Sequence, residues 1–149
     1  MLYLDSRETE QCQYDKLNMP PTQRKFTYYG YKFENYCTGE GSEGVNTSVL
    51  GAGFHSIVRG KVGEFKYLLA AEVDCASAKP PAKNYLELKT SRLMTQDNHV
   101  HTFEKHKMLK YWAQSITVGV PRVCVGFRTE EGFVRATTVM ASPPVSRSS

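Results

Sequence analysis

Two apolar segments that carry a charged residue at every second position constrain this chain more than any other feature. The segment 68–75 contains Glu72 and Asp74, and the segment 85–89 contains Glu87 and Lys89. Side chains alternate between the two faces of a strand, so each segment predicts a strand with two charged groups on one face. If the two strands are neighbours, three carboxylates and one ammonium group converge.

Such a cluster is unfavourable unless something compensates its charge. Like charges opposite each other destabilise a sheet, and burying an unpaired carboxylate costs free energy or shifts its pKa. A hard cation such as Mg²⁺, which prefers oxygen ligands, would remove the conflict. The opposing interpretation is a pair of ordinary amphipathic strands with solvated charges, and the pattern alone does not decide between the two.

Length and composition fit a single globular domain. The 149 residues are 40% hydrophobic and 23% charged, and the net charge of +4 permits a phosphate-bearing partner without requiring one. We expect a polar connector at 1–24, a folded core at 25–140 and a disordered tail at 141–149. The four cysteines have no C-x-x-C spacing, and we find no signal peptide or membrane span. We therefore expect reduced thiols and an intracellular protein without membrane contact.

The spacing of apolar residues predicts an α/β or α+β fold with a mixed β-sheet flanked by helices. Helices are expected at 25–37 and from an N-cap at Asn98 to about Thr117. Strands are expected at 53–60, 65–75, 84–91, 122–128 and 133–139, with the first two and the last two joined as hairpins. The segments 38–44 and 77–83 are expected to be loops.

The two expected helices add candidate polar groups. Gly30 lies four residues before Glu34 and therefore on the same helix face, where its bare surface would let a metal or a phosphate approach the carboxylate. In the second helix, Lys107, Lys110 and Gln114 are expected to share one face, which could track an RNA backbone. Taken alone, an exposed glutamate and a solvated basic helix explain these patterns more simply.

The motifs together resemble the decapping and exoribonuclease (DXO/Dom3Z) family. The resemblance rests on G-Y-K-F-E (30–34), A-E-V-D-C (71–75), Y-L-E-L-K-T-S (85–91), K-M-L-K-Y-W-A-Q-S (107–115) and G-V-P-R-V-C-V-G-F-R (119–128). These segments agree in order and spacing across residues 28–135. The D-x12-E-x-K pattern from Asp74 to Lys89 is also typical of the PD-(D/E)xK nuclease superfamily, so the resemblance implies an incomplete core of that kind within 25–140.

The resemblance implies that the chain hydrolyses RNA 5′ ends that are incompletely capped, triphosphorylated or NAD-capped, with 5′→3′ exoribonuclease activity as a further expectation. Two Mg²⁺ or Mn²⁺ ions are implied. The implied metal ligands are Glu34, Glu72, Asp74, Glu87 and the backbone carbonyl of Leu88. Lys89 and Gln114 would contact the scissile phosphate or the attacking water. A nuclear or cytoplasmic location and a partner exoribonuclease are implied as well.

The chain departs from the family in extent. Family members are much longer and carry an arginine motif upstream of the first helix, for which Arg7 and Arg24 are the only candidates, neither in a matching context. We therefore expect a fragment, a truncated isoform or an incomplete gene model. Two alternatives stay open: a DNA-directed PD-(D/E)xK nuclease, and a product that binds RNA or a partner nuclease without cutting.

Overall fold

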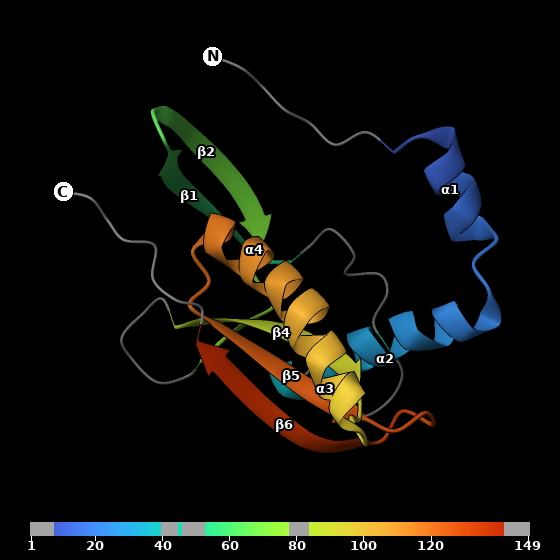
Figure 1. The fold of residues 1–149 in the computed structure, drawn as a ribbon. Helices are drawn as coiled ribbons and strands as arrows, with labels where there is room; N and C mark the ends of the chain where they lie inside the picture. The colour runs from blue at the N-terminus through green and yellow to red at the C-terminus, as the bar shows by residue number, and fades with distance from the viewer. Residues whose placement is uncertain (1–7, 40–44, 46–52, 78–83, 142–149) are drawn as a thin grey trace.

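The computed structural model describes residues 8–39, 45, 53–77 and 84–141 (Figure 1). The elements, in chain order, are α1 (Glu10–Leu17), α2 (Pro21–Thr38), β1 (His55–Val62), β2 (Phe65–Glu72), β3 (Cys75–Ala76), β4 (Tyr85–Arg92), α3 (Asp97–Thr102), the π-helical segment η2 (Phe103–Met108), α4 (Leu109–Val118), β5 (Arg122–Arg128) and β6 (Val134–Ala141). The expected mixed α and β architecture is confirmed. Most of the two expected loops, 38–44 and 77–83, and all of the expected tail except residue 141 lie outside the described residues.

The strands form a four-stranded sheet in the order β3-β4-β5-β6 and a separate hairpin of β1 and β2. β4 and β5 are parallel, whereas β3 and β6 run antiparallel to their neighbours. The parallel pair is joined by α3, η2 and α4, because parallel strands need a long crossover connection. In Figure 1, α4 covers one face of the sheet and α2 passes behind the other. The sheet is therefore enclosed between helices at β4 and β5.

The core lies between η2 and the α4 side of β5. It consists of Phe103, Val123, Val125 and Phe127, and the ring centroids of Phe103 and Phe127 are 5.4 Å apart. On the opposite face, Phe33 of α2 packs directly on Gly126, where an added Cβ would lie 2.8 Å from the ring. Glycine is thus required at this point of β5. Burial on both faces is what a parallel strand between helix layers requires.

Three expectations about helix positions were wrong. The expected connector 1–24 contains α1, whose first turn is capped by the Thr9 side chain accepting from the Cys12 N–H, although none of its residues is buried. α2 begins at Pro21 rather than at 25, because proline fits the first turn of a helix. Asn98 is not an N-cap: α3 begins after Gln96, and Asn98 lies inside its first turn.

The largest correction concerns the expected strand 65–75. β2 ends at Glu72, and the Val73 N–H donates to the Phe54 carbonyl at 2.9 Å as the chain leaves the hairpin. The chain then enters the other sheet, where Cys75 pairs with Leu86. Glu72 and Asp74 therefore do not share the face of one strand, and β2 is not a neighbour of β4. Asp74 reaches β4 through the connection into β3.

All four cysteines are free, as expected for reduced thiols. Burial raises the pKa of the Cys37 thiol to about 11, and burial also raises the pKa values of Cys75 and Cys124. These thiols therefore stay protonated near neutral pH and are weak nucleophiles. Within the described residues, no helix combines the length and the apolar character that crossing a membrane requires.

Candidate active site

The candidate site lies at the edge of β4 that β3 leaves open. β3 pairs only with Tyr85 and Leu86, so among the described strands none covers this edge beyond Leu86. The Leu88 N–H points out of the edge and donates to Asp74 Oδ2 at 2.7 Å. Because the N–H and C=O of one strand residue point to the same side, the Leu88 carbonyl faces the edge as well. A backbone oxygen and the Asp74 carboxylate thus lie at one uncovered position.

Glu87 is the most buried carboxylate of the described residues, with 2% of its surface exposed. It lies on the α4 face of the sheet, where its Oε1 accepts a hydrogen bond from Gln114 Nε2 at 2.7 Å and pairs with the Lys89 ammonium. Lys89 Nζ also lies 3.9 Å from Asp74 Oδ2. Burial raises the pKa of Glu87, and the bond from Lys89 offsets part of that rise. One ammonium group therefore links two carboxylates.

Glu34 joins the cluster from α2. Its pKa is raised to about 7, first by burial and then by the negative charge of Asp74, with smaller contributions from Glu72 and Glu87, while Lys89 acts in the opposite direction. Carboxylates raise each other's pKa in this way only when they are close together. Three separate elements, α2, the connection into β3 and β4, therefore each contribute a carboxylate to one electrostatically coupled region.

Glu72 lies at the rim of this cluster. It is the exposed last residue of β2 and pairs with His55 across the hairpin. Its carboxylate lies directly against Gly53, where an added Cβ would overlap it. The sequence analysis missed Gly53. The signal available was a glycine just before β1, two residues ahead of His55, which pairs with Glu72.

The donor chemistry of the cluster suits a hard divalent cation. Carboxylates and a backbone carbonyl are the oxygen ligands that Mg²⁺ prefers. The pKa of Glu34 is raised mainly by burial and then by the charge of Asp74. In the part of the chain that the structure describes, however, no three His, Cys, Asp or Glu side chains are arranged closely enough to hold a metal ion. The Lys89 ammonium supplies the positive charge between Asp74 and Glu87 instead.

The expected basic helix face is only partly right. Gln114 of α4 reaches Glu87, and Lys107 of η2 reaches Ser91, but Lys110 is exposed. The π-helical segment contains one extra residue in its turn and so shifts the phase of the side chains that precede α4. Of the two arginine candidates, Arg24 donates to the Leu17 carbonyl at 2.6 Å, away from the carboxylates, and Arg7 lies outside the described residues.

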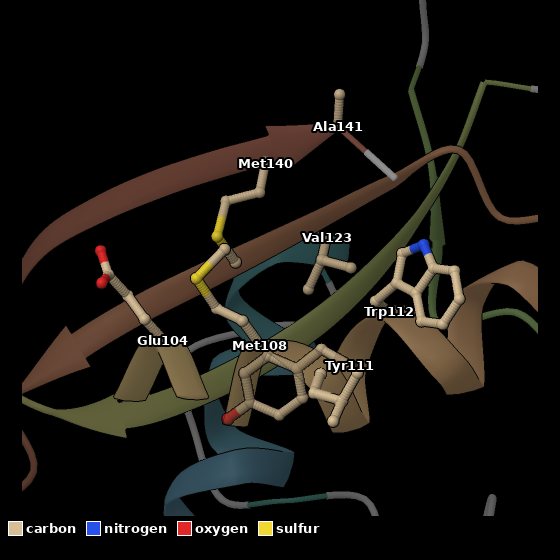
Figure 2. A pocket seen from close by; sticks show the side chains of 8 residues that line it. Glu104, Met108, Tyr111, Trp112, Val123, Met140 and Ala141 are labelled. Carbon is tan, nitrogen blue, oxygen red and sulfur yellow. The ribbon is translucent and has the colours of Figure 1, made fainter. Parts of the chain in front are cut away.

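An apolar cavity lies apart from the carboxylates. It has a volume of about 460 Å³ and lies between the η2–α4 helix and the strands β5 and β6. Figure 2 shows Met108 and Met140 extending toward each other, with Glu104 on one side and Trp112 on the other. None of the candidate catalytic residues lines this cavity.

Comparisons with known proteins identify the family of this chain. A family model described as RAI1 like PD-(D/E)XK nuclease matches residues 1–145. A human decapping and exoribonuclease protein is 40% identical over 144 residues, and the match covers 89% of this chain and 36% of the relative. A decapping nuclease RAI1 from Cryptococcus neoformans is 39% identical over 127 residues, covering 74% of this chain and 32% of the relative.

The fold is shared as well. The crystal structure of Scheffersomyces stipitis Rai1 in complex with (3′-NADP)+ and calcium ion has a TM-score of 0.69 and 28% sequence identity, and the match covers 89% of this chain and 40% of that chain. The chain belongs to the RAI1-like PD-(D/E)XK nuclease family. It spans 36% of the length of the human relative. The resemblance and the fold class expected from the sequence are thereby confirmed.

Proposed function

We propose that this chain carries the catalytic edge of a divalent-metal-dependent hydrolase that acts on the 5′ ends of RNA. The observation that carries the proposal is the pairing of Lys89 with both Asp74 and Glu87 at the open edge of β4, where Asp74 also raises the pKa of Glu34. Two findings support it: the relatives are named decapping and exoribonuclease proteins or decapping nucleases, and a Rai1 structure holds a nucleotide together with a calcium ion.

In this proposal, two Mg²⁺ or Mn²⁺ ions would be held by Glu34, Glu72, Asp74, Glu87 and the Leu88 carbonyl. A bound dication supplies Lewis acidity, which neutralises phosphate charge and makes water a better nucleophile at neutral pH. Glu34 and Glu72 would complete the ligand set from outside the sheet, since they reach the cluster from α2 and from the end of β2. Asp74 is already oriented by the Leu88 N–H.

Lys89 and Gln114 have separate proposed roles. The Lys89 ammonium lies between Asp74 and Glu87, where it would neutralise the charge that develops on the scissile phosphate. The Gln114 amide is fixed by its 2.7 Å bond to Glu87 and would orient the attacking water for an in-line approach to phosphorus. Lys89 of β4 and Gln114 of α4 both bond to Glu87 Oε1, so phosphate and water would be positioned beside the same carboxylate.

The proposed substrates are RNA 5′ ends with incomplete caps, triphosphates or NAD caps. Onward 5′→3′ removal of nucleotides would use the same site, because both reactions hydrolyse a phosphate bond. We also propose that the protein acts in the nucleus or the cytoplasm and that a partner exoribonuclease cooperates with it.

The test offers the 149-residue chain, with Mn²⁺, three substrates in parallel: 5′-triphosphate RNA, NAD-capped RNA and duplex DNA. We expect 5′-end products from both RNAs, no products from DNA, and loss of the products in Asp74→Asn. Cleavage of duplex DNA alone would assign the chain to the DNA-directed nucleases. Binding of Mn²⁺ that disappears in Asp74→Ala, with no turnover of any RNA, would show a binding protein without catalysis.

A further inference from the structure

β4 carries a second polar pair under the same helices as the carboxylates. Ser91 follows Glu87 and Lys89 at alternate positions, so the three side chains share one face of the sheet. Only 3% of Ser91 is exposed, and its Oγ accepts a hydrogen bond from Lys107 Nζ at 3.0 Å. The contact between Ser91 and Lys107 therefore repeats, farther along the strand, the contact between Glu87 and Gln114.

Lys107 is an exposed residue whose ammonium group reaches inward to the buried Ser91 hydroxyl. None of the salt bridges among the described residues includes it. Burial lowers the pKa of Lys107, and the positive charge of Arg128 lowers it further. Arg128 is itself 6% exposed, and its Nε has no hydrogen-bond partner within the described structure. The Arg128 guanidinium lies over the Phe26 and Tyr29 rings and donates to the Thr129 carbonyl, whereas the recorded contact of Lys107 is a neutral hydroxyl. The Lys107 ammonium can therefore take an anionic ligand with its remaining donors.

A cavity of about 200 Å³ lies beside this pair. Leu93, Met94 and Phe103 form the apolar part of its wall, and no Asp or Glu of the described residues contributes to it. The polar part consists of Ser91, Arg92, His99, Thr102 and Lys107. Lys107 keeps two further N–H donors, and the Ser91 hydroxyl, which accepts from Lys107, keeps its own proton to donate. The His99 Nδ1 is buried without a partner in the described chain. The polar part of the wall thus offers hydrogen-bond donors and positive charge, which is the chemistry that recognises phosphate.

We propose that Lys107 and Ser91 form a subsite for a backbone phosphate of RNA, downstream of the scissile phosphate. This inference rests on the proposed function, because only a polynucleotide substrate reaches both places. The rise along a strand of about 3.3 Å per residue puts Ser91 roughly 13 Å from Glu87, a distance that an extended single strand covers in a few nucleotides. The subsite would hold the chain that follows the 5′ end while the carboxylate cluster acts on that end.

The first test measures the Kd of a 5′-phosphorylated RNA pentamer and of a 5′-mononucleotide for the full chain in the presence of Ca²⁺. We expect Lys107→Gln to weaken the pentamer about tenfold, because a charged hydrogen bond to phosphate is lost, and to change the mononucleotide less than twofold. Lys107→Arg should restore most of the affinity. Lys110→Gln, an exposed cation on the same helix, is the matched control and should bind the pentamer like wild type.

A second test locates the contact. A series of pentamers is made, each with one uncharged methylphosphonate linkage at a different position. We expect one of them to bind the wild-type chain as weakly as the unmodified pentamer binds Lys107→Gln. The same linkage should not weaken binding to Lys107→Gln any further. Wild-type affinity of Lys107→Gln for the pentamer would overturn the inference alone. Equal loss of pentamer and mononucleotide, with a lowered Tm, would show a structural role and overturn it too. A wild-type chain that binds no RNA would sink the proposed function, and the inference with it.

Discussion

β4 and β5 run side by side under the same helices, yet they carry opposite chemistry on the α4 face. β5 places Val123, Val125 and Phe127 there, all within the apolar core. β4 places Glu87, Lys89 and Ser91 on that face, in direct register with those three residues. On this face of the sheet, the row of side chains from β5 is therefore apolar, and the adjacent row from β4 is polar.

The difference separates stability from chemistry. Fully burying a Val or Phe side chain contributes about 1.5–3 kcal/mol, so the β5 row stabilises the fold. Burying Glu87 costs free energy that Lys89 and Gln114 offset only by bonding to it. A polar row that does not stabilise the layer is expected where the residues serve a site. The predictions below test whether the two rows separate in this way.

The largest effect is expected for Glu87→Gln. Loss of the buried carboxylate should lower kcat/KM for 5′-triphosphate RNA by about 10³-fold, because the charge that organises Lys89 and the cation is gone. The Tm should stay the same or rise, since a buried charge is removed. Activity assays and thermal melts on the same preparation check both. Intact activity with a lowered Tm would make Glu87 a structural residue.

The opposite behaviour is expected for Val125→Ala in β5. Val125 is 0% exposed, so the truncation leaves a cavity and should lower the free energy of unfolding by about 2–3 kcal/mol. Activity per folded molecule should be unchanged. Urea denaturation measures the loss, and Val139→Ala, at a 54% exposed position of β6, is the control that should change stability little. Equal losses in the two variants would mean that β5 is not the stabilising row.

A smaller effect is expected for Gln114→Ala. Removing the amide leaves Glu87 and Lys89 in place, but the attacking water loses the group that orients it. The kcat should therefore fall about 10- to 100-fold while KM changes little. Steady-state kinetics on triphosphate RNA measures the split. A rise in KM with unchanged kcat would place Gln114 in substrate binding alone.

The smallest effect concerns pH and Glu34. Its pKa of about 7 means that protons compete with Mn²⁺, so the affinity for Mn²⁺ should fall below pH 7 by up to about tenfold per pH unit. Without metal, the folded chain binds more protons than the unfolded chain between the ordinary value of 4.5 and 7. The free energy of unfolding should therefore fall as pH rises through that window. Glu34→Gln should flatten both dependences, and the same slopes in that variant would exclude Glu34 as their source.

The sequence predicted what local periodicity controls. α2, β4 and both hairpins follow from apolar spacing and turn glycines, and Glu87 with Lys89 follows from alternation along one strand. The strand 65–75 was wrong because Cys75–Ala76 is too short to show a period, and its pairing with β4 is a long-range contact. Ser91 was missed because a buried serine is indistinguishable in sequence from an exposed one. Only the position of η2 over β4 distinguishes Lys107 from Lys110.

The central claim is that carboxylates from α2, the β2–β3 connection and β4 form one cation site at the open edge of β4. Calorimetric titration of Mn²⁺ into the wild-type chain and into Asp74→Asn tests it most directly. Asp74 lies outside the strands, and its carboxylate accepts a hydrogen bond from the Leu88 N–H at the site, so the substitution changes the site without changing a strand. We predict saturable binding to the wild-type chain that weakens at least about 100-fold in the variant. Equal affinities for the two proteins, or no binding to the wild-type chain, would contradict the account.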